Sequence, residues 1–87
     1  MRNLEDLISV GPATLKDFEL LGIKTVKQLE KQDARKLYEK LCLLSGVRHD
    51  PCAEDVFRAA IEQAKNPDLP KEQCQWYYWS RKRKNKS

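Results

Sequence analysis

The chain has 87 residues, which is enough for one domain with a modest hydrophobic core. Apolar residues make up 40% of it and are interspersed with charged ones, a composition typical of globular rather than disordered proteins. No apolar run approaches the roughly 18 residues that span a bilayer, and acidic residues near the N-terminus are unlike a signal peptide. We therefore expect a cytoplasmic protein without a membrane partner, whose three irregularly spaced cysteines are reduced thiols.

The formal net charge of +4 is unevenly distributed along the chain. Up to Ser80 there are 12 Lys and Arg residues against 13 Asp and Glu residues, whereas residues 81–87 carry five basic residues and no acidic one. The basic character therefore belongs to the C-terminal segment. We expect a single domain over residues 1–80, followed by a disordered basic tail over residues 81–87.

Caps and helix breakers define two short N-terminal helices. Asn3 suits the cap of the first helix, and Pro12 suits the first turn of the second. Gly22 is expected to end the second helix. Positions at helical spacing supply the apolar faces, Leu4, Leu7 and Ile8 in the first helix and Leu15, Phe18 and Leu21 in the second.

Further helices are expected from residue 25 onwards. Thr25 and Gln28 match a capping box at the start of a short third helix. Asp33 is the expected cap of a fourth helix that ends at residues 45–46, and residues 50–51 begin a fifth that ends at residues 66–67. The expected inward-facing residues are Leu37, Leu41 and Leu44 in the fourth helix, and Val56, Phe57, Ala60, Ile61 and Ala64 in the fifth. A short terminal helix is expected over residues 71–79.

No run of residues alternates as a strand would, so the predicted fold class is all-α. The elements amount to a compact bundle of about five to six short helices.

The segment from Leu4 to Ile23 contains the strongest functional pattern. Two helices joined by a turn at Val10 and Gly11 resemble the helix-hairpin-helix motif, which implies a SAM-like arrangement. Gly11 permits a tight backbone path, and Val10 is expected to point into the core. The N–H groups that begin the second helix would face solvent at the positive end of its dipole, where a phosphate oxygen can bind. Ser9 stands where the motif usually has its first glycine.

The resemblance implies binding to the backbone of DNA or RNA without reading the bases. The contacts would come from the N–H groups near Gly11, Ala13 and Thr14, supplemented by the Thr14 hydroxyl and the Lys16 ammonium. Basic residues that would assist from elsewhere are Arg2, Lys24, Lys27, Arg81 and Arg83.

A wider resemblance covers most of the chain. Residues 21–29 are similar to the segment after the hairpin in C-terminal domains of TfoX-type competence regulators. Residues 49–52, residues 55–58 and the cluster Trp76-Tyr77-Tyr78-Trp79 resemble the bacterial "pathogenicity locus" family, some members of which are labelled mitomycin-resistance proteins. The resemblance implies a bacterial helix-hairpin-helix protein and implies no particular process.

Four residues of zinc-ligand type, Cys42, His49, Cys52 and Cys74, lack the close Cys-x2-Cys pairing of structural zinc sites. The sequence leaves open whether they meet around a metal ion. We expect Cys42 and Cys52 to be small core residues and expect no metal or other cofactor. A base at His49 and a nucleophile at Cys52 lie too close in sequence at a helix start for catalysis, so we expect no enzyme activity.

The aromatic cluster has two interpretations. Beside a basic run, such side chains can stack on single-stranded bases. The favoured alternative is that Trp76 and Trp79, three residues apart on a helix, cover the core. Tyr77 and Tyr78 would then be exposed and available for self-association.

The leading hypothesis is a non-catalytic, sequence-nonspecific nucleic-acid-binding module that uses the hairpin. The alternative is a protein-interaction or self-associating, homo-oligomeric scaffold, in which the hairpin only organises the helices and binds no nucleic acid.

Overall fold

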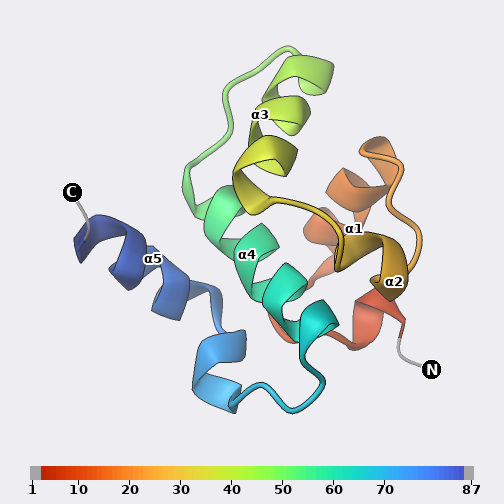
Figure 1. Cartoon of the computed structure of the whole chain (residues 1–87). Helices are drawn as coiled ribbons and strands as arrows, with labels where there is room; N and C mark the ends of the chain where they lie inside the picture. The colour runs from red at the N-terminus through yellow and green to blue at the C-terminus, as the bar shows by residue number, and fades with distance from the viewer. Residues whose placement is uncertain (1–2, 86–87) are drawn as a thin grey trace.

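The computed structural model describes residues 3–85, and within this range seven helical elements follow one another without an intervening strand. In order, they are η1 (Leu4–Asp6), α1 (Pro12–Leu20), α2 (Val26–Leu29), α3 (Ala34–Ser45), α4 (Cys52–Lys65), η2 (Lys71–Cys74) and α5 (Trp76–Asn85). Figure 1 shows α4 at the centre of the fold, with α1 and α2 on one side and α5 on the other. The all-α fold class is confirmed.

The local signals in the sequence place the helix ends as expected. Thr25 and Gln28 form the capping box of α2, with the Thr25 hydroxyl accepting the Gln28 N–H at 3.0 Å. The Asp33 carboxylate accepts a backbone N–H of the first turn of α3. Gly22 and Gly46 end α1 and α3 with φ values of +79° and +73°, which favour glycine because it has no Cβ.

The core lies between α4 and the N-terminal helices. Phe18 of α1 and Phe57 of α4 are almost completely buried, and their ring centroids lie 5.5 Å apart. Burying each such side chain contributes about 1.5–3 kcal/mol to folding. The buried apolar cluster consists of Leu4, Leu7, Phe18, Leu21, Ile23, Leu29, Ala34, Leu37, Leu41, Phe57, Ala60, Ile61 and Ala64.

Five aliphatic positions expected in the core are not fully buried, and three of them, Ile8, Val10 and Leu15, are half-buried near the first turn. Leu44 is 49% exposed, because the last turn of α3 projects beyond the helices that cover Leu37 and Leu41 (Figure 1). Val56 is half-buried, since it lies about 100° around α4 from Phe57 and therefore at the edge of the apolar face. The helical spacing identified the faces correctly and did not show where the covering helices end.

The C-terminal segment differs most from the expectation. A single helix over residues 71–79 was predicted, but η2 ends at Cys74 and a separate α5 begins at Trp76. The predicted disordered tail is helical through Asn85, and residues 86–87 lie outside the described residues. Figure 1 shows α5 lying alongside α4.

An ion pair between Arg83 and Asp55 joins α5 to α4. The guanidinium Nε donates to Oδ1 and Oδ2 at 3.1 and 3.3 Å, and Nη2 donates to Oδ2 at 3.1 Å. Asp55 is only 1% exposed, whereas the Arg83 side chain keeps 34% of its surface. The hydrogen bonds to Asp55 raise the pKa of Arg83. Because a buried carboxylate without a partner is strongly destabilising, the basic segment is a structural part of the domain.

We predict that Arg83→Gln lowers the free energy of unfolding by about 2 kcal/mol, measured by urea denaturation. The cost falls below the roughly 3–5 kcal/mol of a fully buried pair because the guanidinium is one-third exposed. The matched control is Arg81→Gln, which removes an exposed cation from the same helix and should cost less than about 0.5 kcal/mol. Equal losses in the two variants would contradict the structural role of the pair.

Candidate nucleic-acid interface

The turn between η1 and α1, residues 7–11, is tight and contains an unusual backbone conformation. The Val10 N–H donates to the carbonyl oxygen of Leu7 at 3.3 Å. Ser9 has a φ of +73° and is, among the residues described, the only non-glycine residue with positive φ. Residues other than glycine rarely adopt this left-handed backbone conformation because their Cβ atom crowds the backbone. The serine therefore occupies a position whose conformation favours glycine.

The Ser9 side chain explains why a residue other than glycine stands there. Its hydroxyl donates to the carbonyl oxygen of Cys74 at 3.0 Å and accepts the N–H of Trp76 at 3.2 Å. These two bonds attach the turn to the junction between η2 and α5. Glycine would relieve the backbone strain but could not make this connection.

Gln63 of α4 holds the inner side of the same turn. Its side-chain oxygen accepts the Ile8 N–H at 2.9 Å, and its amide nitrogen donates to the Ile8 carbonyl oxygen at 2.7 Å. Gln63 is only 5% exposed, so these bonds satisfy a buried amide. Sequence reasoning missed this residue, although a polar side chain between Ala60 and Ala64 on a buried face is a recognisable signal.

The outer side of the turn presents the N-terminus of α1. Gly11 is its N-cap, and the first backbone hydrogen bond of the helix runs from Leu15 N–H to the Gly11 carbonyl oxygen at 3.0 Å. The N–H groups of Ala13 and Thr14 precede that bond, and no side chain among residues 3–85 caps them. A Cβ built at Gly11 would meet no atom within 4 Å, so the approach to these donors is open. The predicted hairpin residues are thus placed at one helix end.

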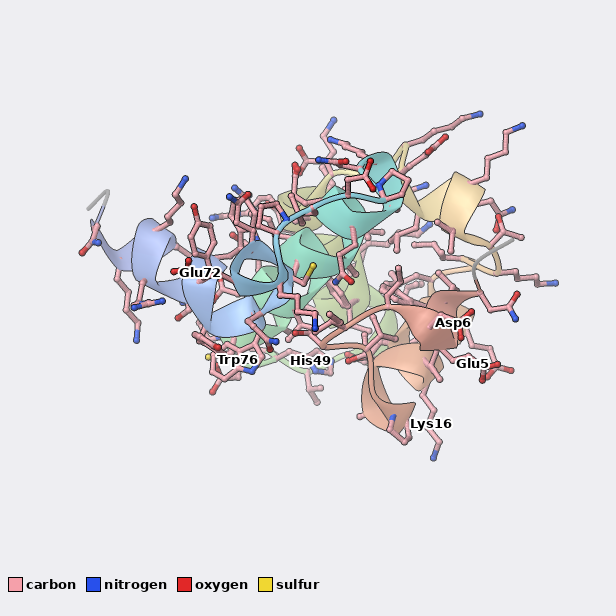
Figure 2. The ribbon with its side chains drawn as sticks, turned by 90° about the horizontal axis from the view of Figure 1, so that it is seen from below. Glu5, Asp6, Lys16, His49, Glu72 and Trp76 are labelled. Atoms are coloured by element: carbon pink, nitrogen blue, oxygen red, sulfur yellow. The ribbon has the colours of Figure 1, made fainter. Side chains whose placement is uncertain are left out.

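Charges of both signs surround this helix end. Lys16 is exposed and points away from the body of the protein, with Glu5 and Asp6 of η1 to one side of it (Figure 2). The Asp6 carboxylate accepts the Asn3 N–H at 2.8 Å. Burial raises the pKa of Asp17, and the charge of a nearby histidine partly offsets that effect. Both negative and positive side chains therefore lie around the start of α1, and Lys16 is the cation on α1 itself.

The basic residues expected to assist lie in several places. Lys24 and Lys27 line a groove of about 560 Å³ together with Lys65, and its lining includes none of the four hairpin residues Gly11, Ala13, Thr14 and Lys16. Arg83 is engaged by its buried partner on α4, so it is not a free cation. Arg81 is exposed, and Arg2 lies outside the described residues. Lys24, Lys27 and Arg83 are therefore not gathered around the hairpin residues.

The four residues of zinc-ligand type are spread over the fold. The His49 N–H donates to Cys42 Sγ at 3.4 Å, while the Sγ of buried Cys74 lies 3.7 Å from a carbonyl oxygen of its own loop. Cys42 and Cys52, expected in the core, are half-buried because they lie at helix ends that the core does not cover. In the part of the chain described, no group of three or more His, Cys, Asp or Glu side chains is placed to hold a metal ion.

The polar groups near His49 make local structural contacts. The Asp50 carboxylate accepts the Cys52 N–H at 2.8 Å, and its hydrogen bond to the thiol raises the pKa of Cys52. A raised pKa keeps the sulfur as a thiol, which is the poorer nucleophile. The Ser45 hydroxyl lies 2.8 Å from His49 Nε2 and bonds the Leu41 carbonyl oxygen at 2.8 Å, so it closes the last turn of α3.

These features define a small helical protein in which an N-terminal turn with an open helix start is bonded to the C-terminal helix. The chain belongs to the Cdd1 family, described as "Pathogenicity locus", whose model matches residues 1–85. The chain is 34% identical over 83 residues to the "Mitomycin resistance protein McrB" of Streptomyces lavendulae, covering 94% of this chain and 74% of that protein. No solved structure matches the chain. None of the helices within residues 3–85 is long and apolar enough to cross a membrane.

We predict that Ser9→Ala destabilises the protein more than Ser9→Gly does. Both variants lose two hydrogen bonds, each worth about 1 kcal/mol. Only glycine relieves the left-handed backbone, so the gap between the variants should be about 1 kcal/mol in the free energy of unfolding. Denaturant titration measures both values, and an alanine variant as stable as the glycine variant would contradict the strained turn.

We also predict that Asp50→Asn speeds alkylation of Cys52 by iodoacetamide at pH 8 by about threefold. The substitution removes the negative charge that raises the pKa of the Cys52 thiol and replaces the carboxylate acceptor by a weaker, neutral amide oxygen, so the thiolate fraction increases. Peptide-resolved mass spectrometry measures the rate, with Cys42 in the same sample as the control. Equal acceleration at both cysteines would point to a general loosening of the fold instead.

Proposed function

We propose that the protein is a non-catalytic module that binds the backbone of nucleic acid, DNA in the first place, independently of sequence. The site is the N-terminus of α1, and the segment from η1 to α1 acts as a helix-hairpin-helix. The observation that carries the proposal is the left-handed turn at Ser9 followed by an uncapped helix start. The resemblance of the hairpin to that motif supports the same function.

The chemistry of the site suits a phosphate oxygen. The N–H groups of Ala13 and Thr14 lie at the positive end of the α1 dipole, where an anion is favoured. Pro12, the first residue of α1, has no N–H, so it adds no unpaired donor to the helix start. The Thr14 hydroxyl is a further donor, and Lys16 adds charge. Such contacts hold a strand without distinguishing its bases.

The inner contacts of the turn support this function indirectly. Ile8 and Ser9 are held by hydrogen bonds from α4 and the η2–α5 junction, so the donors of α1 stand on a fixed base. A preorganised site loses less conformational entropy on binding than a mobile loop. The same bonds direct the open side of the turn toward solvent.

A second candidate, a protein-interaction scaffold, is favoured by one apolar surface. The end of α3 and the loop after it expose Leu43, Leu44 and Val47 by 81%, 49% and 58%. Contiguous exposed apolar side chains are typical of interaction surfaces. If the protein is such a scaffold, it should assemble in a concentration-dependent way, and Leu43→Lys should abolish the assembly. It should not bind nucleic acid.

We predict that Lys16→Glu weakens binding to labelled duplex DNA by at least about tenfold, measured by fluorescence anisotropy across a salt series. The slope of log K against log salt should fall by about one, the value of one lost phosphate contact. The matched control is Lys40→Glu, which makes the same charge change on the exposed face of α3 and should keep the wild-type slope. Gly11→Val, which fills the open approach, should weaken binding while helical circular dichroism is retained.

Equal effects of the two lysine substitutions would show that binding follows net charge and would contradict the hairpin site. Absence of DNA binding by the wild-type protein at low salt would contradict the whole proposal. A chain shortened to Ser80 is unsuitable here, because the deletion removes Arg83 and leaves Asp55 buried without its partner.

A further inference from the structure

The aromatic residues at the start of α5 are not part of the core. Trp76 and Tyr77 are 38% and 47% exposed, while Tyr78 and Trp79 are half-buried. The favoured expectation that the tryptophans cover the core is therefore wrong for Trp76. The Trp79 indole instead donates to the carbonyl oxygen of Gln73 at 2.7 Å, which fixes it against η2.

Cations of the next helical turn lie against the rings of Tyr77, Tyr78 and Trp79. The Arg81 guanidinium is 5.7 Å from the centre of the Tyr77 ring. The Lys82 ammonium is 5.2 and 5.5 Å from the ring centres of Tyr78 and Trp79. The helix thus presents aromatic surfaces bordered by positive charge, a combination that suits a base and its phosphate.

The charge of this surface is positive overall. Residues 71–85 contain five Lys and Arg residues and a single carboxylate, Glu72. Glu72 borders the same hollow as Arg81 and Lys82, so it offsets part of their charge. Arg83 is paired with a buried carboxylate on α4, and this pair keeps α5 folded. Arg81 and Lys82 are therefore displayed on a fixed helix, not on a mobile tail.

The start of α5 adjoins the hairpin turn. The Trp76 N–H donates to the Ser9 hydroxyl at 3.2 Å, so the exposed rings begin next to the residues that precede α1. In Figure 2, Trp76 and Lys16 both lie toward the lower side of the molecule, with His49 between them in this view. A strand whose phosphate lies at the start of α1 would bring a neighbouring base close to Trp76.

We infer that the exposed aromatic side chains at the start of α5, Trp76 and Tyr77, bind unpaired bases of single-stranded nucleic acid beside the phosphate site, with Arg81 and Lys82 of the next turn adding positive charge. The inference rests on the proposed function and specifies its substrate class. The bases of a duplex are stacked on one another and offer no free face, whereas unpaired bases can stack on exposed rings. Trp76 therefore makes single strands the preferred ligand.

The two tryptophans of the chain allow a direct test. Trp79→Phe leaves Trp76 as the sole tryptophan, and Trp76→Phe leaves Trp79. Each variant is titrated with a 12-residue oligothymidine and, at equal ionic strength, with polyglutamate, an anion that lacks bases. We expect oligothymidine to quench the emission of Trp76 strongly and that of Trp79 much less, and polyglutamate to quench neither. Equal quenching by polyglutamate would indicate an acidic-protein surface and overturn the inference.

A second measurement separates this inference from the proposed function. By anisotropy, Trp76→Leu should weaken oligothymidine binding by about tenfold and change duplex binding by less than about twofold. If Trp76→Leu binds oligothymidine as the wild type does, while Lys16→Glu still weakens duplex binding, the inference fails and the proposed function stands. If the wild type binds neither ligand, both fail.

Discussion

The hydroxyl of Ser9 connects the two ends of this small domain. It donates to the carbonyl oxygen of Cys74 and accepts the N–H of Trp76, and its own backbone is held in the left-handed region. Gln63 holds the neighbouring residue from the other side through a buried amide. These contacts hold the turn between η1 and α1 against α4 and against the start of α5. The proposed phosphate site and the aromatic surface adjoin each other for that reason.

The ion pair between Arg83 and Asp55 determines whether the basic segment is a disordered tail or a folded part of the binding surface. As a disordered tail, its charges would provide only a nonspecific electrostatic attraction. As a helix attached to α4, it holds Arg81 and Lys82 in place over aromatic rings. Arg83 stabilises the fold, and Arg81 and Lys82 lie on a defined surface. Charge composition alone could not distinguish these two cases.

The features that the sequence predicted well are those encoded locally. The capping box at Thr25, the cap at Asp33 and the helix-ending glycines at Gly22 and Gly46 each depend on a few neighbouring residues. The spacing of apolar residues likewise identified most of the core, including Phe18. Local physical chemistry therefore accounts for the all-α class and most element boundaries.

The features that it missed depend on contacts between residues far apart in the chain. Asp55 and Arg83 are 28 residues apart, and Ser9 and Trp76 are 67 apart, so no local pattern reveals either contact. Leu44 has the spacing of a core residue, but its burial depends on where other helices end. At the candidate site, the sequence located the open start of α1 and did not reveal that α5 lies beside it.

The most direct test of the account is an NMR titration of the ¹⁵N-labelled full chain with a short single-stranded DNA. The account predicts that the largest amide shifts occur at Gly11, Ala13 and Thr14, followed by those of Trp76 and Tyr77, and that they diminish as salt is raised. Shifts concentrated at residues 43–47, or none at the start of α1, would contradict it.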